Sequence, residues 1–295
     1  MIVLGADIGG TSSRVVLFNN DGERGRADGP GSPMRAGSGE ALATRLAELA
    51  RPLLLRGRAV RADALVVGTA GAGREAERNE LQQALEKQHL AWRVVVTTDA
   101  ELARAAAFEG GPGVLLIAGT GSIAIARDAA GVTRRVGGLG WRMGDQGSAY
   151  WIAARALEAV GAMHDGLGTV THLAESLCTA ARVPGIAGLV QWSASATPSE
   201  VAALCPAVLA CAATGDPVSA SVRDSAVSAL VRLAVAAGAS RLPVALSGGL
   251  LAPDRPLRER VLTALEQQHG ATVIRRAIDP CRGAPFLARE ATRSA

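Results

Sequence analysis

The 295-residue sequence is poor in the side chains on which many nucleic-acid-binding proteins depend. It has three Phe, one Tyr and four Trp, and Lys87 is its only lysine. Single-stranded nucleic acids are bound by aromatic side chains that stack on bases within a basic groove. A net charge of +4 and a pI near 9.3 would suit such a groove, but the basic residues are scattered. We therefore expect no nucleic-acid partner.

Long apolar runs and paired cysteines are also missing. No apolar run approaches the roughly 18 residues that a membrane-spanning helix needs. The segment from Met1 to Leu4 leads directly into a Gly-rich turn, which is unlike a signal peptide. The four cysteines have neither CxxC spacing nor nearby His partners, so we expect buried free thiols. These absences predict a cytoplasmic protein without a membrane partner.

A phosphate loop of the Gly-Lys-Ser/Thr type is absent as well. Any nucleotide must therefore be held by backbone amides, hydroxyl groups and a metal ion. One stretch near the start offers these groups, because a Gly-rich turn lies between the apolar residues 2–4 and 15–18. Glycines allow bare amides to approach phosphate oxygens, and a carboxylate can hold a hydrated Mg²⁺. The residues concerned are Asp7, Gly9, Gly10, Thr11 and Ser12.

A second stretch repeats this pattern roughly a hundred residues later. The apolar residues 114–117 and 123–126 flank a turn that contains Gly119, Thr120, Gly121 and Ser122. A single such turn is equally compatible with an ordinary hairpin. Two similar units in one chain of 295 residues predict a duplicated domain, with one phosphate-binding hairpin in each half.

The remaining segments alternate between strand and helix patterns. We expect helices at 40–55, 74–88, 100–108, 149–160, 170–182, 198–214, 217–238 and 256–267, and strands at 23–29, 92–98 and 272–274, with two more beginning at 64 and 243. Pro52 is expected to kink or end the first helix, and 184–197 to form a loop that carries Trp192.

Two carboxylates lie just before predicted helices. Asp99 follows the strand 92–98, and ligands of parallel α/β sheets bind beyond the carboxyl ends of strands. Asp145 lies among five glycines in the segment 137–148. For either residue, capping of the following helix is an alternative explanation. Ser247, Gly248 and Gly249 end another strand, where a flat group such as adenine could approach closely; a plain strand-to-helix turn is the alternative explanation.

Taken together, these motifs resemble the BadF/BadG/BcrA/BcrD-type ATPases of the actin/hexokinase/Hsp70 superfamily, the group that includes N-acetylglucosamine kinase and bacterial glucosamine kinases. The resemblance implies an α/β fold of two ribonuclease-H-like (actin-like ATPase) domains flanking a cleft. It places one domain at 1–108 and a larger one at 109–282, with a C-terminal helix at about 283–295 packed back on the first. The motifs that carry it are 7–14, 29–37, 68–73, 97–100, 118–122, 137–148, 247–249 and 283–288.

The resemblance also implies roles for individual residues. Asp99 matches the catalytic base of an ATP-dependent hexosamine kinase that phosphorylates the 6-hydroxyl of N-acetylglucosamine or glucosamine. Asp7 is the carboxylate associated with Mg²⁺. The expected ATP and phosphate ligands are Gly9, Gly10, Thr11, Ser12, Gly119, Thr120, Gly121, Ser247, Gly248 and Gly249. The expected amino-sugar ligands are Ser32, Ser122, Gly138, Leu139 and Asp145.

Some positions depart from the family pattern and leave alternatives open. Ser32, Met34, Leu139 and Gln146 replace residues that are common in N-acetylglucosamine kinases, so the acetylation of the sugar stays open, and N-acetylmuramate and glucose remain candidates. One alternative function is an ATPase activator with an iron–sulfur cluster, but no cysteine lies between 121 and 177. Another is a sugar sensor without catalytic activity. A homodimer is one of the assemblies that the sequence allows.

Overall fold

The computed structural model describes residues 1–10, 12–32 and 34–293. The chain divides into two compact units, each of which is described by itself. Unit 1 comprises Met1–Pro112 and Ile278–Ala295, and unit 2 comprises Gly113–Ala277. Residues 109–112 and 278–282, which the sequence assigned to the second domain, therefore lie with unit 1.

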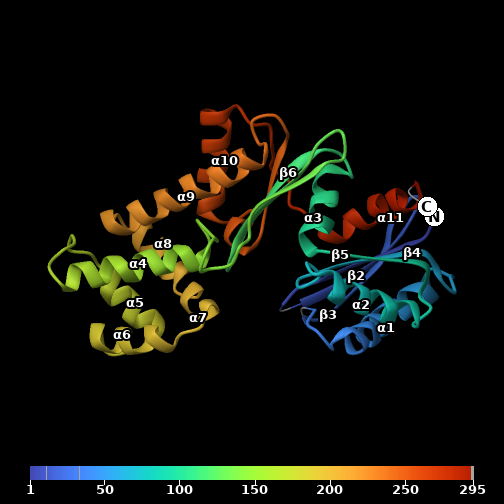
Figure 1. Ribbon diagram of the computed structural model, residues 1–295, viewed down its shortest axis with the longest axis horizontal. Coiled ribbons are helices and arrows are strands. Elements are labelled where there is room, and N and C mark those ends of the chain that lie inside the picture. The colour runs from blue at the N-terminus through green and yellow to red at the C-terminus, as the bar shows by residue number, and fades with distance from the viewer. Residues whose placement is uncertain (11, 33, 294–295) are drawn as a thin grey trace. The chain divides into compact units, whose positions relative to one another are not determined.

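Unit 1 is a five-stranded sheet covered by helices on both faces (Figure 1). The strand order is β3-β2-β1-β4-β5, in which β1 to β3 form an antiparallel meander and β1, β4 and β5 are parallel. Its elements are β1 (Val3–Ile8), β2 (Ser12–Asn19), β3 (Gly22–Pro30), α1 (Gly39–Arg56), β4 (Ala62–Thr69), α2 (Glu75–Glu86), β5 (Ala91–Thr97), α3 (Asp99–Phe108), the 3₁₀ helix η2 (Pro280–Gly283) and α11 (Ala284–Arg293).

Unit 2 repeats this sheet, with the order β8-β7-β6-β9-β10 and the same strand directions. The predicted duplication is thereby confirmed at the level of topology. Its elements are β6 (Gly113–Ala118), β7 (Ser122–Arg127), β8 (Thr133–Gly137), α4 (Ala149–His164), α5 (Leu173–Ala181), α6 (Gly185–Ser195), α7 (Pro198–Ala202), α8 (Cys205–Ala213), α9 (Pro217–Ala237), β9 (Val244–Ser247), the 3₁₀ helix η1 (Gly249–Leu251), α10 (Pro256–His269) and β10 (Val273–Ile274).

Residues 3–6 of β1 are apolar without alternation because both faces of the strand are buried there. Leu4 faces the core that α1 and α2 complete, whereas Val3 faces the core shared with α3 and α11. Gly5 permits the close approach of the C-terminal segment, since a Cβ at this position would lie 2.7 Å from the Cβ of Ala284. The C-terminal helix thus packs on the N-terminal sheet.

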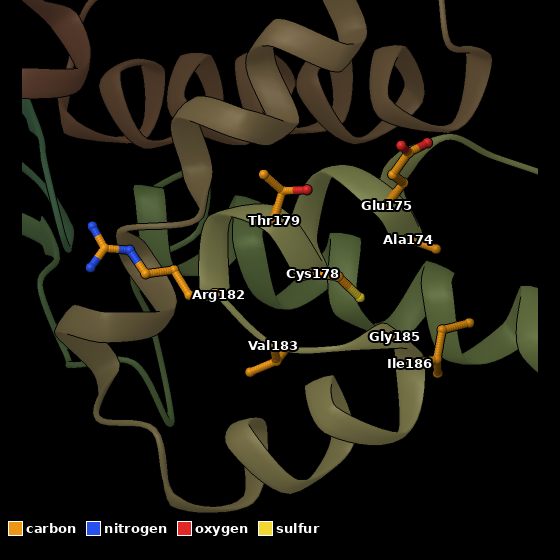
Figure 2. A pocket seen from close by; sticks show the side chains of 8 residues that line it. All are labelled: Ala174, Glu175, Cys178, Thr179, Arg182, Val183, Gly185 and Ile186. Carbon is orange, nitrogen blue, oxygen red and sulfur yellow. The ribbon is translucent and has the colours of Figure 1, made fainter.

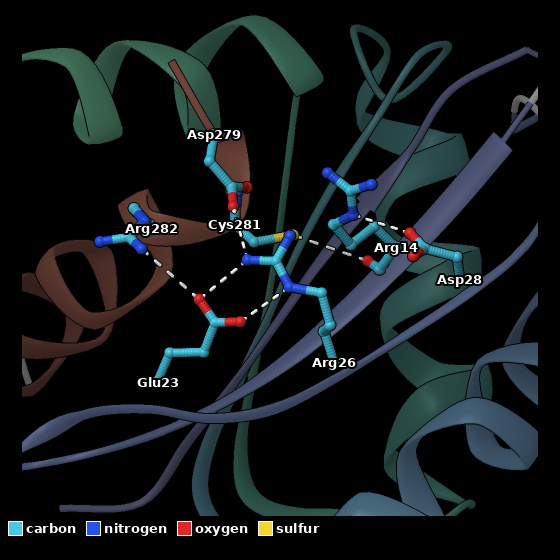
Figure 3. Close-up of polar contacts among 7 residues, drawn as sticks. All are labelled: Arg14, Glu23, Arg26, Asp28, Asp279, Cys281 and Arg282. Atoms are coloured by element: carbon cyan, nitrogen blue, oxygen red, sulfur yellow. Dashed lines mark hydrogen bonds and ion pairs between the residues drawn. The ribbon is translucent and has the colours of Figure 1, made fainter. Parts of the chain in front are cut away.

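Polar contacts fix the same C-terminal segment to the strands β2 and β3 (Figure 3). Arg26 binds both carboxylate oxygens of Glu23, at 2.7 and 2.9 Å, and lies 3.3 Å from Asp279. Arg282 reaches Glu23 at 3.5 Å, and the thiol of Cys281 faces the carbonyl oxygen of Arg14 at 3.6 Å. These contacts therefore join residues 279–282 to strands β2 and β3, which lie far earlier in the sequence.

The structure corrects two sequence-based expectations and adds one strand. Residues 184–197 are not a loop, because 185–195 form α6, whose Leu189 is buried in the core of unit 2. The helix expected at 198–214 is interrupted between α7 and α8, just before Pro206. Helix α1 runs to Arg56, in agreement with the expected helix 40–55, so Pro52 does not end it. Strand β8 was not expected from the sequence pattern. Tertiary packing overrides weak local signals in these places.

All four cysteines are free and buried, as predicted. No single helix among residues 1–10, 12–32 and 34–293 has both the length and the apolar character to span a membrane. Two bent pairs, Leu173–Ala181 with Gly185–Ser195 and Pro198–Ala213 with Pro217–Ala237, meet that test only when their members are taken together.

Candidate functional site

The candidate residues of unit 1 lie at the carboxyl edge of its parallel strands. Strands β1, β4 and β5 end at Ile8, Thr69 and Thr97, respectively. The loop around Met34 is attached to this edge, because the Met34 amide donates to the carbonyl oxygen of Ala70 at 2.9 Å. Residues 9 and 10, Ser32 and Asp99 therefore follow or flank one edge of the sheet, where ligands of α/β proteins bind.

Asp99 is not the cap of the helix that it begins. The N-cap of α3 is Thr98, whose hydroxyl accepts a hydrogen bond from the Glu101 amide at 3.1 Å. Asp99 is the first helical residue and is exposed, and one of its oxygens accepts from its neighbour Ala100 at 2.9 Å. The capping explanation is therefore wrong for Asp99, and its second carboxylate oxygen accepts no hydrogen bond from residues 1–10, 12–32 or 34–293.

A fully buried arginine anchors the helix that carries Asp99. The guanidinium of Arg104 binds both carboxylate oxygens of Glu101, at 2.7 and 2.9 Å, and donates to the carbonyl oxygen of Gly111 at 2.9 Å. Bidentate pairs of this kind are geometrically specific. Arg104 thus ties α3 to the end of unit 1 that leads into β6.

Asp7 lies on β1, between Arg14 on β2 and Gly68 on β4. Burial, together with the negative charges of Asp99 and Asp279, raises the pKa of its carboxyl group to about 6 against the opposing effect of Arg14. Asp7 is thus a partly buried carboxyl group on which the charge of Asp99 also acts. Carboxylates in such a position favour a nearby cation.

The first predicted phosphate turn follows β1; we call it the Gly9 turn. The amide of Gly9 donates to the carbonyl oxygen of Ser12 at 2.9 Å, and Gly10 and Ser12 are exposed. A Cβ at Gly10 would meet no atom within 4 Å, so the packing of the chain itself does not require glycine there. Thr11 was predicted as a phosphate ligand and lies outside the described residues.

The second predicted turn, residues 119–121, is held firmly by helix α4; we call it the Gly119 turn. The amides of Ala149 and Tyr150, in the first turn of α4, donate to the carbonyl oxygens of Gly119 at 2.9 Å and Thr120 at 3.3 Å. Neither the Thr120 amide nor the Gly121 amide donates to an acceptor within the part of the chain that the structure describes. Two backbone donors are therefore free for an anion.

A pocket of about 390 Å³ adjoins the Gly119 turn, a size that suits a small-molecule ligand. Cys205 contributes a neutral, apolar wall, since burial raises the pKa of its thiol to about 12. Arg255, exposed at the start of α10, is the charged residue of the lining. The lining comprises Gly119, Thr120, Ala149, Ala202, Ala203, Cys205, Pro206, Leu209, Gly249, Leu250, Arg255, Pro256 and Leu257.

The predicted residues at the end of β9 differ from one another in what they do. Gly248 has a φ of +93°, and a Cβ there would lie 2.3 Å from the carbonyl oxygen of Ala118. It is required for the close approach of β9 to β6. Gly249 faces open space and lines the pocket. The structure thus brings Gly249 together with Gly119 and Thr120 in the pocket lining, whereas Ser247 pairs with Ile117 in the sheet and neither Ser247 nor Gly248 belongs to that lining.

Three predicted sugar ligands also meet in unit 2. The Gly138 amide donates to the carbonyl oxygen of Ser122 at 2.9 Å, and the Ser122 amide donates to the carboxylate of Asp145 at 3.1 Å. Ser122 is buried, and its hydroxyl donates to the carbonyl oxygen of Gln146 at 2.8 Å. Leu139 lies on the same segment and is 65% exposed.

The N-cap of α4 is Ser148, whose hydroxyl accepts a hydrogen bond from the Trp151 amide at 3.1 Å. The capping explanation is therefore wrong for Asp145 too.

The structure contains a second hollow, away from these residues, between α5 and α6. It measures about 420 Å³ and holds none of the predicted site residues. Figure 2 shows Glu175 and Arg182 toward opposite ends of this hollow, with Cys178 between them. These polar groups do not converge on one point, which makes the hollow a poor candidate for a catalytic site.

The sequence analysis missed most of the pocket beside the Gly119 turn. The residues from α7 and α8, and Arg255, were not among the predicted ligands. Pro206 inside the expected helix 198–214 was the one available signal of a break there. The break lies against the end of β9 because of tertiary packing, and no local sequence pattern indicates that position.

The fold and the paired turns define a protein of the actin-like ATPase class. Within this class, the chain belongs to the BadF/BadG/BcrA/BcrD ATPase family, whose model matches residues 4–288. A solved structure from Chromobacterium violaceum, described as a candidate N-acetylglucosamine kinase, is 26% identical, with 97% of this chain and 98% of that chain covered and a TM-score of 0.77. These similarities confirm the predicted family and fold class.

Two curated proteins are also similar. An N-acetylmuramic acid/N-acetylglucosamine kinase from Clostridium acetobutylicum is 31% identical over 158 residues, which is 53% of this chain and 52% of that protein. An N-acetyl-D-glucosamine kinase from Dictyostelium discoideum is 27% identical over 187 residues, or 60% and 59% of the two chains. The chain thus matches about half the length of these curated relatives.

Proposed function

We propose that the protein is an ATP-dependent hexosamine kinase that phosphorylates the 6-hydroxyl of N-acetylglucosamine or glucosamine. The observation that carries the proposal is the pocket of about 390 Å³ beside the free amides of the Gly119 turn. The apolar pocket suits a nucleoside, and the two backbone amides beside it can donate hydrogen bonds to the phosphates of that nucleoside. The membership in an ATPase family and the similarity to proteins named as amino-sugar kinases support the same function.

In this proposal, unit 2 holds the nucleotide. The adenosine lies in the apolar pocket against Gly249, and the amides of Thr120 and Gly121 bind phosphate oxygens. Such donors need no reorganisation when charge develops on the transferred group. The Gly9 turn of unit 1, with Gly10 and Ser12, contributes further donors, and the proposed phosphate role of Thr11 belongs to the same turn.

Asp99 is the proposed general base. Its carboxylate accepts a hydrogen bond from the sugar hydroxyl and takes the proton as the hydroxyl oxygen attacks the γ-phosphorus. The bond from that phosphorus to the bridging oxygen breaks, and ADP leaves. A positioned base typically contributes about 10²–10⁴-fold to the rate. The free oxygen of Asp99 at the carboxyl edge of the sheet supports this role.

The residues around Asp7 fit a hydrated Mg²⁺. No group of three or more His, Cys, Asp or Glu side chains forms a metal cage in the described chain, and Mg²⁺ commonly uses only one or two carboxylates and keeps its waters. A cation would also relieve the repulsion between Asp7 and Asp99 that raises the pKa of Asp7. Bound Mg²⁺ neutralises phosphate charge during transfer. Asp7 would hold it through its waters.

The amino sugar is proposed to contact Ser122, Gly138, Leu139 and Asp145 of unit 2 and Ser32 of unit 1. The hydrogen bonds that join Ser122, Gly138 and Asp145 support a common role for these three residues. The proposal also implies a cytoplasmic site of action, where ATP is plentiful, while a homodimer stays a prediction of the sequence.

The test is ADP release from ATP and Mg²⁺ with a panel of acceptors: N-acetylglucosamine, glucosamine, N-acetylmuramate, glucose and no sugar. We expect strong stimulation by one of the first two, which also settles the acetylation of the substrate. ADP binding measured by calorimetry serves as the control for a functional nucleotide site. A sample that binds ADP and responds to no sugar would contradict the kinase and favour an activator or a sensor.

A further inference from the structure

One carboxylate joins the segment 137–148 to the Gly119 turn. The Asp145 side chain accepts a hydrogen bond from the Ser122 amide at 3.1 Å. The same carboxylate lies so close to Gly121 that a Cβ there would be 2.9 Å from both of its oxygens. Asp145 therefore touches the turn both by a hydrogen bond and by direct packing.

The backbone of Asp145 is held in an uncommon conformation. Its φ is +58°, a region in which Asp and Asn are the favoured non-glycine residues. The carbonyl oxygen of Asp145 accepts from the Ser148 amide at 3.1 Å, and the fully buried Ser148 caps α4. The strained conformation thus places the carboxylate against the turn and the carbonyl against the helix.

The other polar groups of the Gly119 turn are also used within unit 2. The carbonyls of Gly119 and Thr120 accept from the first turn of α4, and that of Gly121 accepts from the Gly119 amide at 2.9 Å. The hydroxyl of the adjoining Ser122 donates to Gln146. The two amides of Thr120 and Gly121 are left to face a ligand. Their direction depends on how Gly121 and Ser122 are held, and Asp145 is the side chain that holds them.

We propose that Asp145 is a positioning residue for the nucleotide, because its carboxylate sets the shape of the Gly119 turn and couples that turn to the segment 137–148. The inference rests on the proposed function, which assigns phosphate to the turn and sugar to the segment. Coupling between two sites is reciprocal, so nucleotide binding changes sugar affinity by the same factor by which sugar changes nucleotide affinity. Asp145 thus acts on ATP as well as on the sugar.

The first test measures ADP affinity by calorimetry without any sugar. Asp145→Asn keeps an acceptor oxygen and tolerates a positive φ, so it should bind ADP within about 3-fold of the wild type. Asp145→Gly tolerates the same backbone but lacks the carboxylate, and Asp145→Ala lacks both features. Both should bind about 10-fold more weakly, since a charged hydrogen bond is lost. The exposed Asp165→Ala, at the other end of α4, is the control and should be unchanged.

Two outcomes of this series would overturn the proposal. Wild-type affinity in Asp145→Gly would show that only the backbone conformation matters. An equal loss in Asp145→Asn and Asp145→Ala would show that the acceptor oxygen is not what holds the turn. The effect of N-acetylglucosamine on ADP affinity should also fall toward none in Asp145→Ala, and an unchanged coupling factor would contradict the proposed link.

A second test needs no ligand and separates this inference from the kinase proposal. Amide hydrogen exchange of Ser122, whose amide donates to Asp145, should speed up about 10-fold in Asp145→Gly and stay near wild type in Asp145→Asn. Equal exchange in all variants would overturn the inference even if no nucleotide binds. In a double-mutant cycle, Gly121→Ala should speed exchange less in the Asp145→Gly background than in the wild type, because the clashing carboxylate is gone. Additive effects would contradict the direct contact.

Discussion

The two hairpin turns have the same topology and very different surroundings. In unit 1, the Gly9 amide donates to the Ser12 carbonyl oxygen in the turn after β1, and the charges of Asp99 and Asp279 act on the carboxyl group of Asp7. In unit 2, α4 and Asp145 fix the turn after β6, and an apolar pocket lies beside it. The difference suggests a division of labour, in which unit 1 supplies charged groups for chemistry and unit 2 a preformed nucleotide site.

The largest effect should come from Asp99→Asn in unit 1. Loss of the base should lower kcat by about 10²-fold or more, while ADP affinity stays near wild type because the nucleotide pocket lies in unit 2. Single-turnover phosphoryl transfer and ADP calorimetry check the two parts. A variant that retains wild-type turnover would remove Asp99 from the chemistry.

Arg104→Ala should cause the largest loss of stability in unit 1. The guanidinium is fully buried, and its removal leaves Glu101 and the Gly111 carbonyl without their partner. Breaking a buried pair in this way typically costs about 3 kcal/mol or more of unfolding free energy. The matched control is Arg155→Ala, which breaks an exposed pair with Glu158 of the same spacing and should cost less than about 1 kcal/mol. Equal urea-unfolding midpoints would contradict the anchoring role.

Gly248→Ala and Gly249→Ala compare a closely packed glycine with a glycine that faces open space, both at the end of β9 in unit 2. The first forces a positive φ and a clash with the Ala118 carbonyl, so we expect a loss of about 2–4 kcal/mol in unfolding free energy. The second meets no neighbouring atom and should leave stability nearly unchanged, while ADP affinity falls because the pocket wall changes. Thermal unfolding and calorimetry measure the pair, and a stable Gly248→Ala would refute the close approach.

Several of these site features were predictable because they rest on local patterns. Glycine and hydroxyl residues between apolar runs indicated both turns, and Asp99 stood out by following a buried strand. The capping alternatives for Asp99 and Asp145 failed because Thr98 and Ser148 take the caps instead. Because a hydroxyl side chain caps the helix in both cases, the carboxylate is not used as a cap. Each helix start offers two plausible capping residues, and the sequence pattern does not decide between them.

Other features could not be predicted because tertiary contacts create them. The wall formed by α7 and α8 faces the end of β9, about forty residues further along the chain, and no periodicity links the two. Strand β8 reads as polar because it is exposed, and its pairing with β7 alone makes it a strand. The register of Asp7 beside Gly68 likewise depends on sheet assembly.

The buried carboxylates of the two units should respond to acid in different ways. Burial raises the pKa of Asp216 in unit 2, but hydrogen bonds from Ser219, His172 and Thr171 outweigh this effect and lower it to about 2. A lowered folded-state pKa gives stability that is present above the usual pKa near 3.8 and lost as the pH falls through about 2.

The wild type should therefore lose about 2 kcal/mol more unfolding free energy between pH 4 and pH 2 than Asp216→Asn does. Urea unfolding at a series of pH values measures the difference. Asp7 in unit 1 shifts in the opposite direction and contributes no such acid-labile term. Parallel pH profiles for the two proteins would show that Asp216 is not held as a carboxylate.

The smallest effects on stability should come from Gly10→Ala and Gly119→Ala, which compare the turns directly. Neither glycine has a positive φ, and a Cβ at either position meets no atom within 4 Å, so unfolding free energy should change by less than about 1 kcal/mol. Their effects on ligands should differ, because Gly119 lines the pocket and Gly10 does not. Gly119→Ala should weaken ADP binding about 10-fold, whereas Gly10→Ala should spare ADP and lower turnover, since the first turn serves the transferred phosphoryl group. If Gly10→Ala weakened ADP binding as strongly as Gly119→Ala, both turns would bind the phosphates of ADP. That result would contradict the division of labour between the units.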